Sequence, residues 1–134
     1  MGAWGHGPFD NDSAQDWLGE LTAAGPSRVG SAVQAIASSA PGATLSVDTC
    51  SIALAAAELV AAARDGRTAW LDDASAGWIA THRDALLALD VARIRDAVER
   101  IASDSDLREL WSDAGKRGEA FHAYVRELVQ RLSR

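Results

Sequence analysis

The feature that most constrains the fold is an alanine-rich stretch near the middle of the chain, from Val47 or Asp48 to Arg64. Alanine has the best intrinsic helix propensity, and Asp65-Gly66 supplies a stop, so the stretch predicts one long α-helix. A helix that is apolar on every side has to be covered on every side, and we therefore expect it at the centre of the protein. Its apolar residues are Ile52, Ala53, Leu54, Ala55, Ala56, Ala57, Leu59 and Val60.

Two helices are predicted before this central one. The first runs from Ser13 to about Ala23, with Asp12 as its N-cap and Gln15 completing a capping box. Gly25-Pro26 ends it. The second runs from about Ser27 to Ser39 and ends at a loop that contains Pro41 and Gly42. Apolar residues recur at helical spacing in both: Ala14, Trp17, Leu18 and Leu21 in the first, and Val29, Ala32, Val33, Ile36 and Ala37 in the second.

Shorter helical segments are predicted after Gly66. Two short helices are expected near 74–81 and 83–89, followed by a helix that Asp90 caps and that extends to Ile101. Asp96 and Arg100 stand four residues apart in it, as an ion pair on a helix surface requires. A further helical turn is expected at 107–111.

The last helix, from about Gly118 to Leu132, has the clearest amphipathic pattern. One stripe is apolar: Phe121, Tyr124, Val125, Leu128, Val129 and Leu132. The residues expected to face away from the core are His122, Arg126, Glu127, Gln130 and Arg131.

Together these patterns predict an all-α fold, a single compact multi-helix bundle of about six to seven helices. The 134 residues are most naturally one helical domain, 1–134, because a chain of this length buries enough surface for its own core. The segment Met1 to Asp12 is expected to be an ordered aromatic and glycine loop, since flexible tails rarely carry large aromatic residues such as Trp4 and Phe9.

This N-terminal loop contains most of the candidate functional residues: Trp4, His6, Phe9 and Asp10, with Asp16 just beyond it. In one interpretation Trp4 and Phe9 plug a hydrophobic groove, which Gly5 and Gly7 allow the chain to reach. In the other interpretation the loop forms part of a pocket for a ligand or a protein partner. The five tryptophans of the chain are expected to be core anchors rather than a ligand cage.

A metal site is the chemical alternative, because His6, Asp10, Asp12 and Asp16 are residue types that bind metals. Their spacing is not that of a calcium-binding EF-hand, which would need a glycine at Gln15. In the structural interpretation each aspartate has another role. Asp12 caps the helix and Asp10 makes a hydrogen bond in a turn, while the negative charge of Asp16 in the first turn interacts favourably with the helix dipole. We therefore predict no cofactor and no metal, with a small metal-dependent hydrolase that uses His6 and these aspartates as the alternative.

The opening Trp4-Gly5-His6-Gly7-Pro8-Phe9-Asp10-Asn11-Asp12, followed by Ala14 and Asp16-Trp17-Leu18, resembles bacterial proteins grouped as domain-of-unknown-function family 4259. The segments Ala55-Ala56-Ala57-Glu58 and Leu107-Arg108-Glu109-Leu110-Trp111 are also similar to that family, so the resemblance spans nearly the whole chain. It implies a compact, stand-alone bacterial protein of this length, and it brings no catalytic residue and no cofactor with it.

The charge distribution indicates the class of partner. The net charge is −6, and residues 1–66 carry seven acids against two bases. This acidity argues against binding nucleic acid or an anionic membrane surface, where basic patches supply the affinity. Cys50, the single cysteine, is expected to be a buried, inert thiol. We predict a cytoplasmic bacterial protein, not an enzyme, that binds or regulates a protein partner with a basic surface; a homodimer stays open.

Overall fold

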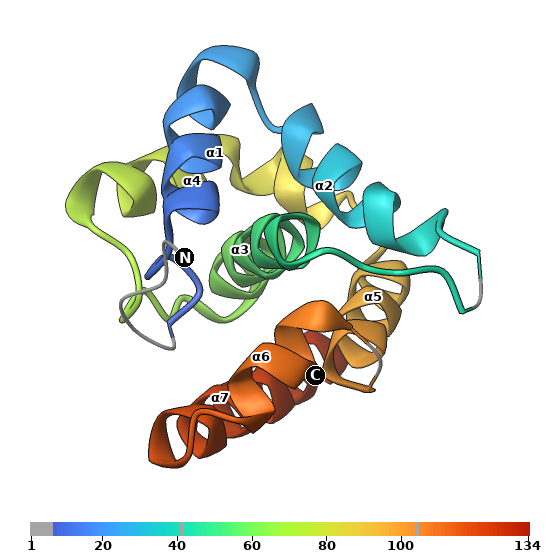
Figure 1. Ribbon diagram of the computed structural model, residues 1–134. Helices are drawn as coiled ribbons and strands as arrows, with labels where there is room; N and C mark the ends of the chain where they lie inside the picture. Colours follow the sequence, from blue (N-terminus) through green and yellow to red (C-terminus); the bar gives the residue numbers. More distant parts are fainter. Residues whose placement is uncertain (1–6, 41, 104) are drawn as a thin grey trace.

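The computed structural model describes residues 7–40, 42–103 and 105–134. These residues form an all-α bundle in which α3 (Val47–Asp65) lies at the centre and other helices pack around it (Figure 1). The helices around it are α1 (Asp12–Ala24), α2 (Ser27–Ala37), α4 (Asp73–Leu87), α5 (Val91–Ser103), α6 (Asp106–Ser112) and α7 (Lys116–Ser133). The prediction of a compact multi-helix bundle is confirmed.

The central position of α3 follows from its composition. Every residue from Ala53 to Ala63 is buried, so the helix has no face toward solvent over three turns. Alanine side chains are small, which allows helices on several sides to approach the α3 backbone closely and fill the space around it. Gly66 ends the helix in the left-handed region at φ 74°, where glycine carries no steric penalty.

The N-cap of α1 is Asn11, and the prediction that Asp12 is the cap is wrong by one residue. Asn11 is extended, and its side chain accepts a hydrogen bond from the Ala14 amide at 2.8 Å. Asp12 is already inside the helix. The Gln15 side chain bonds the Phe9 carbonyl at 2.9 Å rather than closing a capping box with Asp12.

The two short helices predicted near 74–81 and 83–89 are one kinked helix, α4. Its backbone leaves helical geometry at His82, with φ −108° and ψ 16°. The His82 ring nitrogen Nδ1 lies 2.9 Å from the Trp78 carbonyl, and the ring stacks on the Trp78 indole at 4.4 Å. The predicted break therefore falls at the observed kink, and these local contacts keep the two halves together.

Asp90 caps α5 as predicted, accepting from the Arg93 amide at 3.2 Å. The predicted pair between Asp96 and Arg100 is wrong. Arg100 instead reaches α2 and the residues after it, where it donates to the carbonyls of Ile36, Ser39 and Ala40 at 3.1, 2.7 and 2.7 Å. The carbonyls at the end of a helix lack partners within it and carry partial negative charge, so they attract a guanidinium.

The short helix α6 and the first turns of α7 form a tight hairpin. A Cβ added at Gly118 would lie 1.8 Å from the Trp111 carbonyl oxygen, so only glycine allows this approach of the two backbones. The Trp111 and Phe121 rings stack across the hairpin at 5.3 Å. The predicted apolar stripe of α7 faces the core, with Val129 only partly buried.

Of the helices in the described ranges, none is both long enough and apolar enough to cross a membrane.

Candidate functional site

The described part of the N-terminal segment begins with a reciprocal turn between Gly7 and Asp10. The Gly7 amide donates to Asp10 Oδ2 and the Asp10 amide donates to the Gly7 carbonyl, both at 3.2 Å. A Cβ on Gly7 would lie 2.7 Å from the Trp70 ring, so glycine is required for this close approach. Trp70 in turn packs edge-on against Tyr124 of α7 at 5.4 Å. Asp10 thus makes the turn bond expected from the sequence.

Of the candidate residues that the structure describes, Phe9, Asp10 and Asp16 do not gather around one opening. Phe9 is 5% exposed and belongs to the core, as the plug interpretation requires. Trp4 and His6, together with Gly5, lie outside the described residues. Asp16 lies on the exposed side of α1, in a different environment from Phe9 and Asp10.

Asp16 lines a solvent-open groove of about 500 Å³ between α1, α2 and the start of α3. Three carboxylates border the groove, from Asp16, Glu20 and Asp48, and all three residues are exposed. Asp16 and Glu20 are four residues apart, which places them on the same side of α1. The apolar part of the lining consists of Trp17, Ala32 and Ile52, and Ser13, Arg28 and Ser31 complete it.

One cation belongs to the groove lining. Arg28, in the first turn of α2, contacts Glu20 with its Nη2 at 2.5 Å from Oε2. Its Nε is buried and has no hydrogen-bond partner among the residues that the structure describes. A cation in the first turn also opposes the helix dipole. Arg28 is therefore held in the groove by a single exposed ion pair, the kind that contributes at most about 1 kcal/mol.

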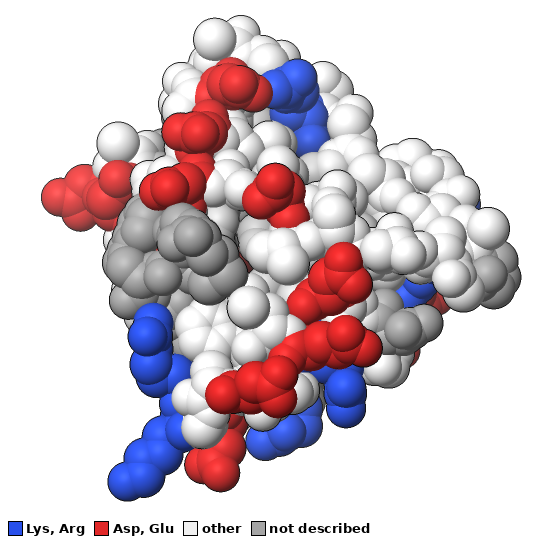
Figure 2. All heavy atoms as spheres, in the orientation of Figure 1, with Lys and Arg blue, Asp and Glu red and all other residues white. Residues whose placement is uncertain are grey.

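The groove is part of a wider acidic surface. In the view of Figure 2, acidic side chains dominate the region that α1 occupies, while most of the cationic side chains lie at the opposite end, over α6 and α7, where acidic side chains are interspersed with them. Ser13 donates to Asp48 at 2.8 Å, which fixes one of the three carboxylates between α1 and α3. The groove thus presents negative charge at its border and apolar surface within.

The described residues give no support to the alternative prediction of a metal site. Over 7–40, 42–103 and 105–134, no group of three or more His, Cys, Asp or Glu side chains is placed to hold a metal ion. His82 is half-buried against Trp78, and His122 Nε2 lies 3.4 Å from the Ser112 hydroxyl. Cys50 is fully buried, as predicted, and burial raises the pKa of its thiol to about 11, so it is an unreactive thiol at neutral pH.

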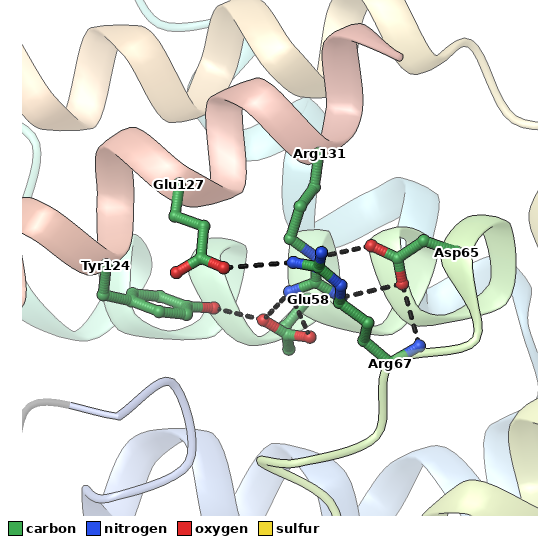
Figure 3. Close-up of polar contacts among 6 residues, drawn as sticks. All are labelled: Glu58, Asp65, Arg67, Tyr124, Glu127 and Arg131. Carbon is green, nitrogen blue, oxygen red and sulfur yellow. Dashed lines mark hydrogen bonds and ion pairs between the residues drawn. The ribbon is translucent and has the colours of Figure 1, made fainter.

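A polar cluster joins α3 and α7 (Figure 3); Glu58, Tyr124 and Arg131 lie inside the protein, and Asp65, at the end of α3, is exposed. Arg131 donates to both oxygens of Glu58 at 2.9 Å, and to Asp65 at 2.6 and 3.1 Å. The Tyr124 hydroxyl donates to Glu58 at 2.6 Å. Glu58 is 1% exposed and Arg131 4%, so neither side chain can meet a substrate in solution. We refer to Glu58, Asp65, Tyr124 and Arg131 as the buried ion cluster.

Burial sets the electrostatics of this cluster. It raises the pKa of Glu58, and the bonds from Tyr124 and Arg131 only partly oppose it. It also raises the pKa of Tyr124 well above 10, and the adjacent Glu58 carboxylate adds to the rise. Burial would raise the pKa of Asp65 too, but the hydrogen bonds from Arg131 and from the Arg67 amide outweigh it and lower that pKa. The cluster holds charges in place and joins two helices, which is a structural role.

Sequence reasoning missed this cluster and placed Arg131 on the outward face of the last helix, which is wrong. A signal was present in Glu58, the single charged residue in the otherwise apolar run 52–63 of α3. An acid buried in such a position requires a cationic or hydrogen-bonding partner. The sequence does not show which of the basic residues supplies it, because Arg131 is 73 positions away.

Comparison with known proteins gives a match to a family model. The model of a family described as "Domain of unknown function (DUF4259)" matches residues 2–123. This range contains the N-terminal segment from Gly2 onward and every residue that lines the acidic groove. No curated protein and no solved structure matches the chain.

Proposed function

The chain belongs to the DUF4259 family, and from the geometry of the acidic groove we propose that it is a non-enzymatic protein that binds a basic segment of a protein partner there. The observation that carries the proposal is the combination of three exposed carboxylates with an apolar interior in one groove. The proposal includes a bacterial, cytoplasmic setting and a regulatory role for the binding.

Lysine and arginine match this combination better than other side chains. Each has an apolar stem and a cationic head, and such side chains place the stem on apolar surface while the head stays in a polar environment. The stem would lie against Trp17, Ala32 and Ile52, and the head would reach Asp16, Glu20 or Asp48. Hydrogen bonds between a guanidinium and a carboxylate are charge-assisted and stronger than neutral ones.

Arg28 provides an example within the chain. Its guanidinium already contacts Glu20 at the groove, so the site accommodates this chemical group. The contact is single and exposed, which leaves Asp16 and the second carboxylate oxygen of Asp48 available for cations from a partner. Exposed charges also steer association, so the binding rate should fall as ionic strength rises.

The test compares two variants of equal charge. The groove variant carries Asp16→Asn, Glu20→Gln and Asp48→Asn, and the control variant carries Asp73→Asn, Asp84→Asn and Glu119→Gln, which are exposed acids outside the groove. Proteins captured from a bacterial lysate are accepted as partners only if the control variant retains them and the groove variant does not. Each is then purified, and its affinity is measured at low and high salt.

We expect a salt-dependent affinity that the groove variant loses and the control variant keeps. Equal capture by both variants would overturn the groove as the binding site. If the only protein captured is a second copy of this chain, the result would instead support a homodimer, and light scattering of the purified protein would test this. Turnover of a small molecule by the pure protein would overturn the non-enzymatic role.

A further inference from the structure

Arg28 already places a guanidinium in the acidic groove. Its Nη2 lies 2.5 Å from Glu20 Oε2, so the pair joins the start of α2 to α1. The two side chains are 42% and 63% exposed, which keeps the pair in contact with water. An exposed pair of this kind contributes little to stability, because water screens the attraction and two long side chains lose conformational freedom. The groove thus holds a guanidinium at Glu20, but holds it weakly.

Two further features lower the cost of moving Arg28 away from Glu20. The Arg28 Nε is buried, and no acceptor in 7–40, 42–103 or 105–134 lies within hydrogen-bond distance of it. A side chain that turned outward would gain water as an acceptor for this nitrogen, whereas a buried donor without an acceptor is unfavourable. Arg28 also stands in the first turn of α2, where the helix dipole disfavours a cation. Release of the guanidinium therefore loses little beyond the ion pair itself.

An arginine from a partner can bind Glu20 more completely than Arg28 does. The present ion pair uses one nitrogen and one carboxylate oxygen. A guanidinium that arrives from solvent can align two N–H groups with both oxygens, the bidentate arrangement that strengthens arginine–carboxylate pairs. Lysine has no such planar fork. Both oxygens of Glu20 are then used, and two guanidinium groups beside one carboxylate repel each other, so Arg28 has to leave.

The groove has room for the incoming side chain, and Glu20 is open to solvent. A cavity of about 150 Å³ in another protein holds benzene, which has almost as many heavy atoms as an arginine side chain. The groove measures about 500 Å³. Its apolar lining, from Trp17, Ala32 and Ile52, accepts the stem of the side chain while the head stays at the carboxylates.

We infer that Arg28 holds the place of an arginine of the partner, which displaces it from Glu20 on binding; this inference rests on the function proposed above. In the free protein the Arg28 guanidinium occupies the carboxylate, and in the complex the partner's guanidinium does. The groove then selects a basic segment that carries an arginine at this position. A segment that offers only lysine there competes less well with Arg28.

The experiment uses three probes of similar length that differ in the head group: Nα-acetyl-arginine amide, Nα-acetyl-lysine amide and the neutral Nα-acetyl-citrulline amide. Each is titrated at low salt into the full-length protein labelled with ¹⁵N, and the backbone amides of Asp16 and Glu20 are followed by NMR. We expect saturable binding of the arginine probe, binding of the lysine probe that is weaker by roughly three- to tenfold, the value of one further hydrogen bond, and none of the citrulline probe. Equal affinity for arginine and lysine would overturn the inference.

The Arg28 Nε–H resonance reports displacement in the unaltered protein. This group is buried in the free protein, so its hydrogen should exchange slowly with water. We expect the exchange to become faster as the arginine probe is added, with the same saturation curve as the groove amides. The resonance is identified by its loss in Arg28→Gln. Exchange that stays slow at saturation would show that Arg28 remains in place, and it would overturn the displacement.

A matched pair of variants measures the competition. Arg28→Gln should strengthen binding of the arginine probe by roughly two- to fivefold, the strength of one exposed ion pair. Arg83→Gln removes the same charge from an exposed position outside the groove and should leave the affinity nearly unchanged. Equal affinity with and without Arg28 would overturn the displacement and leave the groove as a binding site. Failure of the arginine probe to bind the groove in any of these proteins would overturn the proposed function, and the inference with it.

Discussion

Arg131 of α7 and Glu58 of α3 form a buried, two-bonded ion pair, with Arg131 Nη1 at 2.9 Å from each carboxylate oxygen. The two residues are 73 positions apart in the sequence and are exposed by 4% and 1%. Asp65 and Tyr124 complete the buried ion cluster, which fixes how α7 lies against the central helix. Its members allow sharp tests of the structure.

Removing one partner of the pair should be costly. Arg131→Met leaves the Glu58 carboxylate buried without its cation, and we expect the free energy of unfolding to fall by about 3–5 kcal/mol. Adding Glu58→Leu should restore much of the loss, because the unpaired charge is then gone. Denaturant unfolding measures both. The control is Arg67→Ala, which breaks the exposed pair with Glu127 and should cost about 1 kcal/mol or less; an Arg131→Met loss no larger than this would contradict the prediction.

Tyr124 is the single tyrosine, so its ionisation can be read directly by ultraviolet absorbance. Its pKa in the folded protein is raised well above 10, so the unfolded chain loses the tyrosine proton first as the pH rises. The corresponding stability is fully present below pH 10 and decreases above it. We expect tyrosinate absorbance to appear together with unfolding, and Tyr124→Phe to abolish this part of the alkaline destabilisation. Ionisation of Tyr124 while the helices remain folded would show that the hydroxyl is accessible to solvent.

Asp65 should make the protein less stable as the pH falls, whereas Tyr124 makes it less stable as the pH rises. Its pKa is lowered from 3.8 in the folded protein, so its contribution to stability is present above pH 3.8 and is lost as the pH falls through the folded value. The difference in unfolding free energy between the original chain and Asp65→Asn should therefore shrink on acidification. Acid titrations of both, followed by circular dichroism, measure this. A difference that is constant with pH would mean that Asp65 keeps its ordinary pKa.

Gly118 should not tolerate a side chain. In Gly118→Ala the new Cβ would lie 1.8 Å from the Trp111 carbonyl oxygen, so the α6–α7 hairpin must open, and we expect a loss of about 3 kcal/mol or more. Gly19→Ala is the matched control, since no atom lies within 4 Å of its Cβ position in α1. It should raise stability by about 0.5–1 kcal/mol through better helix propensity. Equal effects in thermal unfolding would show that the hairpin is not closely packed.

The two candidate caps of α1 can be separated in the same way. Asn11→Ala removes the side chain that accepts from the Ala14 amide, and we expect a cost of about 1 kcal/mol. Asp12→Ala lies one position inside the helix and should change stability by less than about 0.5 kcal/mol. If denaturant unfolding shows a larger loss of stability for Asp12→Ala than for Asn11→Ala, then Asp12 is the N-cap.

Local patterns in the sequence determined where most helices lie and which faces are apolar. Residues 47–65 predict a helix that is apolar on nearly every side and therefore lies at the centre. Residues 121–132 predict a helix with one apolar stripe, which packs against the core. Such patterns depend on neighbours three or four residues apart, which any single sequence displays. For the same reason Asp16 could be singled out, while its groove could not, because Glu20, Arg28 and Asp48 come together only when three helices pack.

Only the tertiary structure decided which polar groups meet. Arg131 has the spacing of an outward-facing residue, yet it lies inside because Glu58 needs a cation there. Arg100 stands four residues from Asp96, yet it binds carbonyls at and beyond the end of α2, which lack partners within that helix and come within its reach only when α2 and α5 pack. Gly118 is required only because Trp111 lies against it. Apolar burial follows a periodic pattern along the chain, whereas the choice of a polar partner depends on distances that exist only after the helices have packed.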